Sequence, residues 1–189
     1  MKTVNSLSGG KTSSYIAANY PADYDVFALV RIEDKRCTFP DKKLRQEVED
    51  RIQAPFIATA EDDTIIYTML DLEQYIGRKI TWLTGKTFDK IIVHGDKKYL
   101  PNVTQRFCTT EMKLKPIFEW WRSEIGKPIK TRIGYRANEH SRAKTMLSKL
   151  NDEGLSTYKA IVGKRGTRNK WADIGWQRPV FPLIKDNIY

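Results

Sequence analysis

Short apolar segments alternate with helical patterns along most of the chain, and this alternation constrains the fold more than any other feature of the sequence. Strands are expected at residues 4–7, 24–30, 56–59, 90–94 and 128–134. Helices are expected at residues 12–20, 40–52, 62–75, 116–125 and 138–150, where apolar residues recur at helical spacing. Strands that alternate with helices usually form a mostly parallel sheet covered by helices. The sequence therefore predicts an α/β protein with a mostly parallel five-stranded sheet and helices on both faces.

The last part of the chain breaks this alternation. Residues 151–178 are rich in glycine, lysine and arginine, and we expect a long loop or a small subdomain there. Aromatic residues are interleaved with the basic ones: Tyr158, Trp171 and Trp176. The predicted organisation is an α/β domain over residues 1–150, followed by a basic, aromatic-containing extension or insertion over residues 151–189.

The charge is positive and unevenly distributed. The chain carries 33 lysine and arginine residues against 23 aspartate and glutamate residues, a formal net charge of +10. Residues 1–77 hold 9 basic and 13 acidic side chains, whereas residues 78–189 hold 24 basic and 10 acidic ones, a net charge of +14. A field of this sign attracts nucleotides, DNA or RNA, or an acidic partner. Solubility alone is the other interpretation, and the sequence leaves both open.

Composition argues against several classes of protein. Hydrophobic residues make up 40% of the chain, which is enough for a buried core. No stretch approaches the roughly 18 apolar residues that span a bilayer, and the first residues lack the apolar run of a signal peptide. We therefore expect a cytoplasmic protein with no membrane partner. Two cysteines, Cys37 and Cys108, are too few for a four-cysteine zinc or iron–sulfur site, and with two histidines we expect no transition-metal site.

Two glycines, a lysine and several hydroxyl residues stand where the first expected strand meets the first expected helix. Glycine allows the backbone to turn with positive φ and to approach a ligand closely. The amino end of a helix presents N–H groups and a partial positive charge to an anion, and Lys11 adds a full charge. The residues expected to bind a nucleotide here are Ser8, Gly9, Gly10, Lys11, Thr12 and Ser13.

Spacing separates this loop from the other common phosphate loop. A Walker A loop needs a glycine five positions before the glycine of Gly-Lys-Ser/Thr, and Asn5 occupies that position here. The segment instead resembles the PP-loop signature, S-G-G-x-[DT]-S. A glycine-rich helix start that binds no ligand is the alternative that this segment alone leaves open.

Three later segments extend the resemblance. Residues 106–116, RFCTTEMKLKP, resemble a C-T-x-x-[LM]-K-x-x-P segment. Residues 133–142, IGYRANEHSR, resemble G-[IFY]-R-x-x-E, and residues 181–184 read FPLI, like [YF]-P-L-I. These segments are similar to those of the phosphoadenosine-phosphosulfate (PAPS) reductase-like family of the PP-loop, or adenine nucleotide α-hydrolase, superfamily. The resemblance is strongest to phage and bacterial members, and the segments follow the family's order across almost the whole chain.

The resemblance implies a Rossmann-like fold of the HUP or PP-loop type that binds an adenosine nucleotide, ATP or a PAPS-like compound. The loop would cradle the phosphates. Lys11, Lys113 and Arg136 would stabilise the charge that develops when a bond at the α-phosphate breaks. The adenine would lie near Leu29 and Arg31, at the end of the second strand.

Three further residues are expected in the site because they lie next to an expected strand end or a phosphate-binding segment in the sequence. His94 and Asp96 follow the expected strand 90–94, so His94 would contact phosphate or substrate and Asp96 would help to hold Mg²⁺. Cys108 would lie beside the phosphate-binding groups. Ordinary structural roles stay open for them: His94 as a strand-end histidine and Cys108 as a small buried hydrophobe. Arg136 has the same alternative, as an ion-pair partner of Glu139 or Asp96.

The chain departs from the family at positions that bear on catalysis. PAPS reductases carry a C-terminal Glu-Cys-Gly-Leu-His segment whose cysteine attacks sulfur, and here no cysteine follows Cys108. Phe107 replaces the first cysteine of the family's iron–sulfur pair, so we expect no cluster from this chain alone. Thr12 stands where many PP-loops have an acid. Residues 186–189 resemble the start of a helix that family members continue, which leaves open whether the native chain extends past Tyr189.

Two functions from different classes follow from these observations. The first is a PP-loop ATP pyrophosphatase or nucleotidyl transferase, in which an acceptor attacks the α-phosphate or receives sulfur, with DNA or RNA as a candidate acceptor. The second is a catalytically silent nucleotide- or nucleic-acid-binding module. PAPS reduction by this chain alone is not expected. A homodimer is a further expectation, because homodimers are common in the superfamily that the chain resembles.

Overall fold

The computed structural model describes residues 1–102 and 104–189, apart from the side chain of His94. The chain forms two compact units. The first unit contains Met1–Ser6, Lys11–Asp25 and Gly126–Tyr189. The second unit contains Leu7–Gly10 and Val26–Ile125. The first unit therefore combines both ends of the sequence, while most of the second unit is one continuous stretch.

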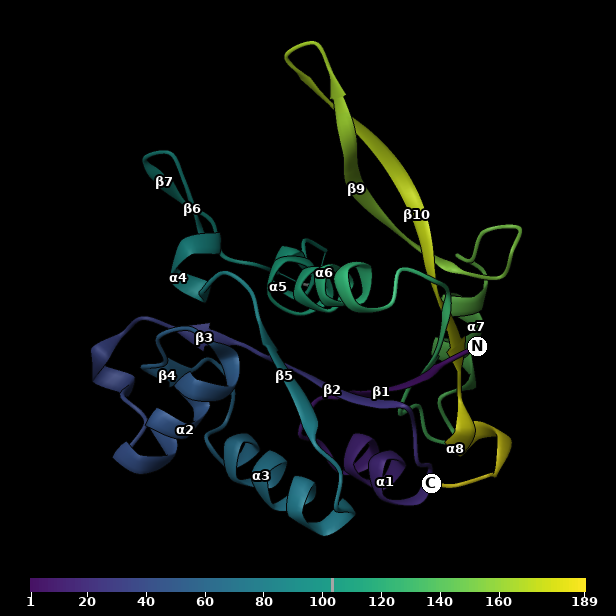
Figure 1. The fold of residues 1–189 in the computed structure, drawn as a ribbon, viewed down its shortest axis with the longest axis horizontal. Coiled ribbons are helices and arrows are strands. Elements are labelled where there is room, and N and C mark those ends of the chain that lie inside the picture. Colours follow the sequence, from purple (N-terminus) through teal and green to yellow (C-terminus); the bar gives the residue numbers. More distant parts are fainter. Residues whose placement is uncertain (103) are drawn as a thin grey trace. The chain divides into compact units, whose positions relative to one another are not determined.

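The chain is an α/β protein with a six-stranded, mostly parallel sheet (Figure 1). Strand β8 (Ile129–Arg132) pairs in parallel with β1 (Thr3–Leu7) and with β10 (Arg168–Val180), whereas β10 and β9 (Ser156–Arg165) pair antiparallel. The expected class and the mostly parallel sheet are confirmed, but the expected count of five strands is wrong. In spatial order the strands are β5 (Ile80–Thr84), β2 (Tyr24–Leu29), β1 (Thr3–Leu7), β8 (Ile129–Arg132), β10 (Arg168–Val180) and β9 (Ser156–Arg165).

Residues 151–178 are the largest departure from the expected fold. The expected long loop is wrong, because β9 and most of β10 occupy this stretch and form a long hairpin. The sequence hides these strands because glycine and charged residues interrupt the alternation of apolar and polar residues that marks a strand.

Two other expected strands are also corrected. Residues 90–94 are not a strand of the main sheet: they contain the end of helix α4 (Phe88–Ile91) and strand β6 (Val93–His94), which pairs with β7 (Lys97–Lys98). Within residues 56–59 only β4 (Ala58–Thr59) is a strand, and it pairs antiparallel with β3 (Arg31–Ile32) in a separate two-stranded sheet.

All five expected helices are present, with ends that shift by a few residues. They are α1 (Lys11–Asn19), α2 (Lys42–Ile52), α3 (Thr64–Ile76), α6 (Lys115–Glu124) and α7 (His140–Leu147). Helix α2 begins where it does because the Asp41 carboxylate accepts hydrogen bonds from the N–H groups of Lys43 and Leu44. Shorter elements are the 3-10 helix η1 (Lys35–Cys37), α5 (Phe107–Thr109), the π-helical turn η2 (Thr110–Leu114) and α8 (Pro182–Lys185). No described helix has the length and apolar character needed to cross a membrane.

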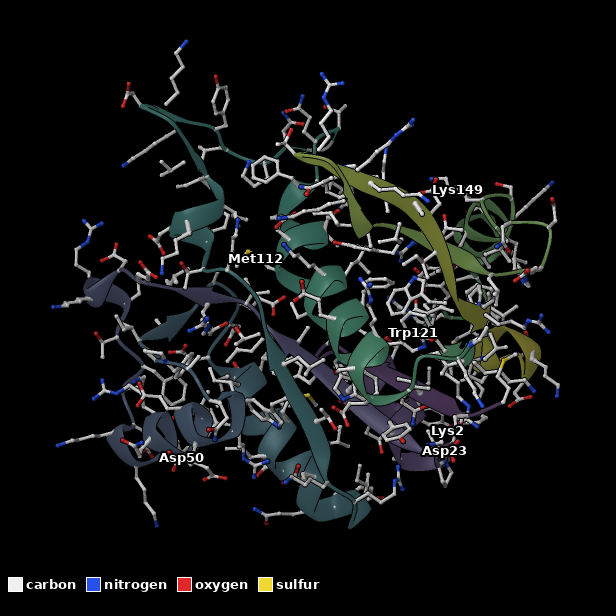
Figure 2. The ribbon with its side chains drawn as sticks, turned by 45° about the horizontal axis from the view of Figure 1, so that its top comes forward. Lys2, Asp23, Asp50, Met112, Trp121 and Lys149 are labelled. Carbon is white, nitrogen blue, oxygen red and sulfur yellow. The ribbon has the colours of Figure 1, made fainter. Side chains whose placement is uncertain are left out.

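The core of the second unit is built from aromatic and aliphatic side chains of strands and helices. Phe27 of β2 meets Trp82 of β5 edge to face, with 5.0 Å between ring centroids. Figure 1 shows α3 and α6 on opposite sides of the strand layer that contains β2. Met112 and Trp121 are buried on the continuous helical stretch of η2 and α6 that Figure 2 labels. This packing fixes the helical segment that carries Lys113.

The core of the first unit contains a buried polar cluster. The Asn5 side chain is fully buried and donates a hydrogen bond of 2.8 Å to the Asp25 carboxylate. Arg132 donates to the Asn5 side-chain oxygen and to the main-chain oxygen of Tyr20. A buried carboxylate needs such donors because burial removes its water. The cluster ties β1 and β8 to the end of α1.

Candidate functional site

The loop between β1 and α1 requires glycine at its second position. Gly9 has φ +73°, a left-handed conformation that favours glycine. A Cβ atom at this position would lie 2.5 Å from Cγ2 of Ile65 and 3.1 Å from its Cβ. Ser8 and Gly10 on either side are exposed, and α1 begins at Lys11. The loop therefore places exposed residues directly before the start of α1.

Residues from the loop and from the G-[IFY]-R-like segment at residues 133–142 line one cavity of the first unit. Lys11 and Thr12, at the amino end of α1, line a cavity of about 450 Å³ together with Arg136. Lys11 is exposed and takes part in no ion pair within the described part of the chain. The remaining lining residues are Tyr15, Leu183, Ile188 and Tyr189. The cavity thus combines two cations with aromatic and aliphatic walls.

A close approach at Gly134 brings the same two segments together. A Cβ atom on Gly134 would lie 3.1 Å from Oγ1 of Thr12 and 3.4 Å from the main-chain nitrogen of Ser13. The glycine of the expected G-[IFY]-R segment therefore lets the chain after β8 pass directly against the start of α1. This contact explains why Arg136, two residues later, faces the same cavity as Lys11.

Arg136 is held in place by Glu139. The Glu139 carboxylate accepts a 2.8 Å hydrogen bond from the Arg136 main-chain N–H and lies 3.9 Å from the Arg136 guanidinium. That main-chain bond, together with the Arg142 side chain, lowers the pKa of Glu139 below its ordinary value. The ion pair with Glu139 that the sequence left open is present. The Arg136 side chain is nevertheless 56% exposed, so it is accessible to an anion in the cavity.

The aromatic residue before Arg136 supports this turn. The Tyr135 ring stacks on Phe181 with 5.4 Å between centroids, and the Arg142 guanidinium lies 4.5 Å from the Tyr135 centroid. Phe181 is the first residue of the FPLI segment. The G-Y-R and FPLI segments that the resemblance singled out are therefore in contact.

Lys113 is placed by the second unit and is already paired. Its ammonium group forms an ion pair with the Glu61 carboxylate. Lys113 lies on η2, a π-helical turn, and such turns occur frequently at functional sites. Gly85, after β5, allows η2 to pack closely, since a Cβ there would lie 2.6 Å from the Glu111 main-chain oxygen. The Lys113 charge is thus compensated within the second unit.

Leu29 and Arg31 were expected beside the adenine. In the structure Leu29 packs in the core, and the Arg31 side chain hydrogen-bonds within the second unit. Leu29 is 1% exposed and belongs to the core. The Arg31 guanidinium donates to Oγ1 of Thr84 and to the main-chain oxygens of Pro55 and Gly85. Burial lowers the pKa of Arg31 below its ordinary value. These bonds join β3 to the end of β5, so the Arg31 side chain is engaged in holding the second unit together.

Asp96 and Cys108 have different surroundings within the second unit. The expectation for His94 and Asp96 assumed a sheet strand at residues 90–94, and that strand is absent. Asp96 is exposed in the turn between β6 and β7, and the His94 side chain lies outside the described residues. Cys108 packs against the apolar cluster of Val30 and Met112. This matches the interpretation of Cys108 as a small hydrophobe.

Two tyrosines of the cavity were missed by the sequence interpretation. Tyr15 lies four residues after Lys11, and residues at that spacing share one face of a helix. This spacing is a signal that the sequence contains. Tyr189 carries no such signal, because it reaches the cavity through the path of the chain after α8. Among the described residues no group of three or more His, Cys, Asp or Glu side chains could hold a metal ion.

The structure thus defines an α/β protein with a glycine-rich turn and a cationic cavity at the start of its first helix. No protein-family model, curated protein or solved structure matches this chain. The family resemblance therefore rests on the segments quoted from the sequence.

Proposed function

We propose that this chain binds an adenosine nucleotide, ATP or a PAPS-like compound, with its phosphates at the amino end of α1. The observation that carries the proposal is the shared cavity: Lys11, Thr12 and Arg136 come from segments far apart in the sequence and line one space. Its volume of about 450 Å³ falls in the range typical of small-molecule sites.

The chemistry of the lining suits a phosphate chain attached to a flat, apolar group. Lys11 and Arg136 supply two positive charges, and the amino end of α1 adds the partial positive charge of the helix dipole. The Thr12 hydroxyl donates a hydrogen bond to a phosphate oxygen. Tyr15 and Tyr189 provide ring faces against which a base packs. This arrangement moves the expected base contact from Leu29 and Arg31 to the tyrosines.

The proposed reaction is cleavage at the α-phosphate with release of pyrophosphate. An acceptor attacks the α-phosphorus, and negative charge accumulates on the phosphate oxygens. Lys11 and Arg136 stabilise that charge, and electrostatic stabilisation of this kind is usually the largest single contribution to catalysis.

Mg²⁺ does not fit a protein-built site in this cavity. Mg²⁺ prefers carboxylate oxygens among protein ligands, and no described lining residue has a carboxylate side chain. A magnesium ion would therefore arrive bound to the nucleotide phosphates and water.

A second candidate function is nucleotide binding without turnover. Two observations favour it: Thr12 stands where many PP-loops have an acid, and the Lys113 charge is compensated by Glu61. Such a protein would sense or sequester the nucleotide through the same cavity.

Pyrophosphate release from ATP tests the proposed reaction and separates the two candidates. We expect release by the unmodified chain and its loss in Lys11→Ala and Arg136→Gln. Lys42→Ala is the matched control, because Lys42 is also an exposed first residue of an α-helix. ATP binding without pyrophosphate release supports the silent module. Absence of both binding and release contradicts the proposal.

A further inference from the structure

The hairpin of β9 and β10 ends in a segment that no other part of its unit covers. Residues 161–171, here called the hairpin tip, are exposed without exception. Figure 1 shows the hairpin extending away from the rest of the first unit. Trp171 is 53% exposed, and Ile161 and Val162 are each 40% exposed. Large exposed side chains on a projecting ribbon mark a surface for contact with another molecule.

The hairpin tip concentrates positive charge without compensation. Its sequence, IVGKRGTRNKW, contains four basic residues and no acidic one. Within the described part of the chain, none of the four forms an ion pair. Arg165 lies directly opposite Arg168 in the ladder, and like charges at such positions destabilise a sheet. A repulsive pair of this kind is relieved when an anion binds between or beside the two side chains.

Alternation along the two strands divides the side chains of the hairpin tip between two faces. The register shifts between Lys170 and Trp171, and beyond the shift Arg165 pairs with Arg168. Alternation along β10 places Arg168 and Lys170 on one face and Asn169 and Trp171 on the other. One face therefore carries Arg165, Arg168 and Lys170, while the other carries Asn169, its ladder partner Lys164, and Trp171.

We propose that the hairpin tip binds duplex DNA by entering its major groove. The major groove of B-DNA is about 12 Å wide and admits a two-stranded β-ribbon. Strands in such a ribbon lie about 4.8 Å apart, so the ribbon with its side chains fills the groove. Arg165, Arg168 and Lys170 meet phosphates on the flanking strands. Asn169 presents the amide that pairs well with the adenine edge.

The arrangement of charge and apolar groups favours DNA over a lipid surface. The end of the hairpin, between Arg165 and Arg168, is charged and polar, and the apolar residues Ile161 and Trp171 lie further back. Insertion into a bilayer would carry the two arginines in first, which is costly. The deep, narrow major groove of an RNA duplex is closed to a ribbon. The tip therefore fits the groove of DNA best.

The proposed DNA contact is independent of the nucleotide cavity. Strand β10 runs for 13 residues from Arg168 to Val180, which corresponds to roughly 40 Å along an extended strand. Val180 precedes Phe181, which stacks on Tyr135 beside Arg136. The tip and the cavity thus lie at opposite ends of one strand, and each is testable without the other.

The test is a fluorescence anisotropy titration of labelled duplex DNA over a series of salt concentrations. The variant is Arg165→Gln/Arg168→Gln, and the control is Lys42→Gln/Lys43→Gln, which removes two exposed charges from the start of α2. We expect the variant to bind several-fold more weakly, with a salt slope smaller by about 1.8, since each phosphate contact contributes about 0.9. The control retains the wild-type slope.

Four results would overturn the proposal: no DNA binding by the wild type, an equal loss in the control, tighter binding of single strands or of an RNA duplex, or binding of phosphatidylserine vesicles in place of DNA. Thermal unfolding of both variants verifies that they fold. A nucleotide titration of Arg165→Gln/Arg168→Gln should match that of the wild type. This last measurement keeps a failure of the DNA contact distinguishable from a failure of the nucleotide site.

Discussion

Replacing Gly9 with alanine tests why the loop between β1 and α1 requires glycine. The left-handed backbone, with φ +73°, costs an L-residue roughly 1–2 kcal/mol, and alanine recovers about 0.4–1 kcal/mol by stiffening the unfolded chain. The new Cβ would also lie 2.5 Å from Cγ2 of Ile65. Ile65 is β-branched and helical, so its side chain has little freedom to rotate away. Overpacking adds about 1–3 kcal/mol, which brings the expected loss of unfolding free energy to about 1–4.5 kcal/mol.

Gly77→Ala isolates the backbone part of this cost. Gly77 has φ +60°, and a Cβ there would meet nothing within 4 Å. We expect Gly77→Ala to lower the unfolding free energy by about 1 kcal/mol, measured by equilibrium unfolding in urea. In the double variant Gly9→Ala/Ile65→Ala, removal of the obstructing side chain should restore about 1–3 kcal/mol relative to the sum of the single changes. The reasoning is refuted if Gly9→Ala costs no more than Gly77→Ala, or if the two changes simply add.

Three further predictions concern the first unit and the cysteines. The Tyr20 hydroxyl donates a hydrogen bond to Asp186 that raises the pKa of Tyr20 to about 12. The stabilisation of the folded state by this bond is present below about pH 10 and is lost as the pH rises towards about 12. Urea midpoints measured across this window should fall for the wild type, and Tyr20→Phe should lack this alkaline loss. Asn5→Ala removes a donor from the buried Asp25 carboxylate and should lower the unfolding free energy by about 1–3 kcal/mol in urea, whereas an unchanged midpoint would contradict the role of the cluster. Sulfite should not be released from PAPS with thioredoxin and excess reductant, because Cys108 packs in an apolar cluster; turnover that disappears in Cys108→Ser would reverse this conclusion.

The sequence predicted those parts of the fold whose pattern is local. All five expected helices formed because their apolar stripes and start signals, such as Asp41 before α2, act within the segment itself. Residues 90–94 show the limit, since a short apolar run fits a buried strand and a buried helix turn equally well. The hairpin was missed for a different reason: most of its charged residues face solvent on a ribbon whose strand character comes from cross-strand pairing.

The candidate site shows the same division. The loop and Arg136 were predicted from sequence segments, and the close approach at Gly134 brings them together. Partners that depend on tertiary packing were not predictable. Examples are the Glu61 carboxylate on Lys113 and the main-chain oxygens that engage Arg31. Neither contact has a signature in the sequence near the residue concerned.

Calorimetric titration of ATP into the wild type, Lys11→Ala and Lys42→Ala tests the nucleotide site most directly. Both lysines are exposed and begin an α-helix, but only Lys11 lines the cavity with Arg136. The account predicts binding by the wild type and by Lys42→Ala with equal affinity. It predicts a loss of about 1.5–3 kcal/mol in Lys11→Ala, roughly a tenfold to hundredfold increase in Kd. Equal affinity in all three proteins, or no binding by the wild type, would contradict it.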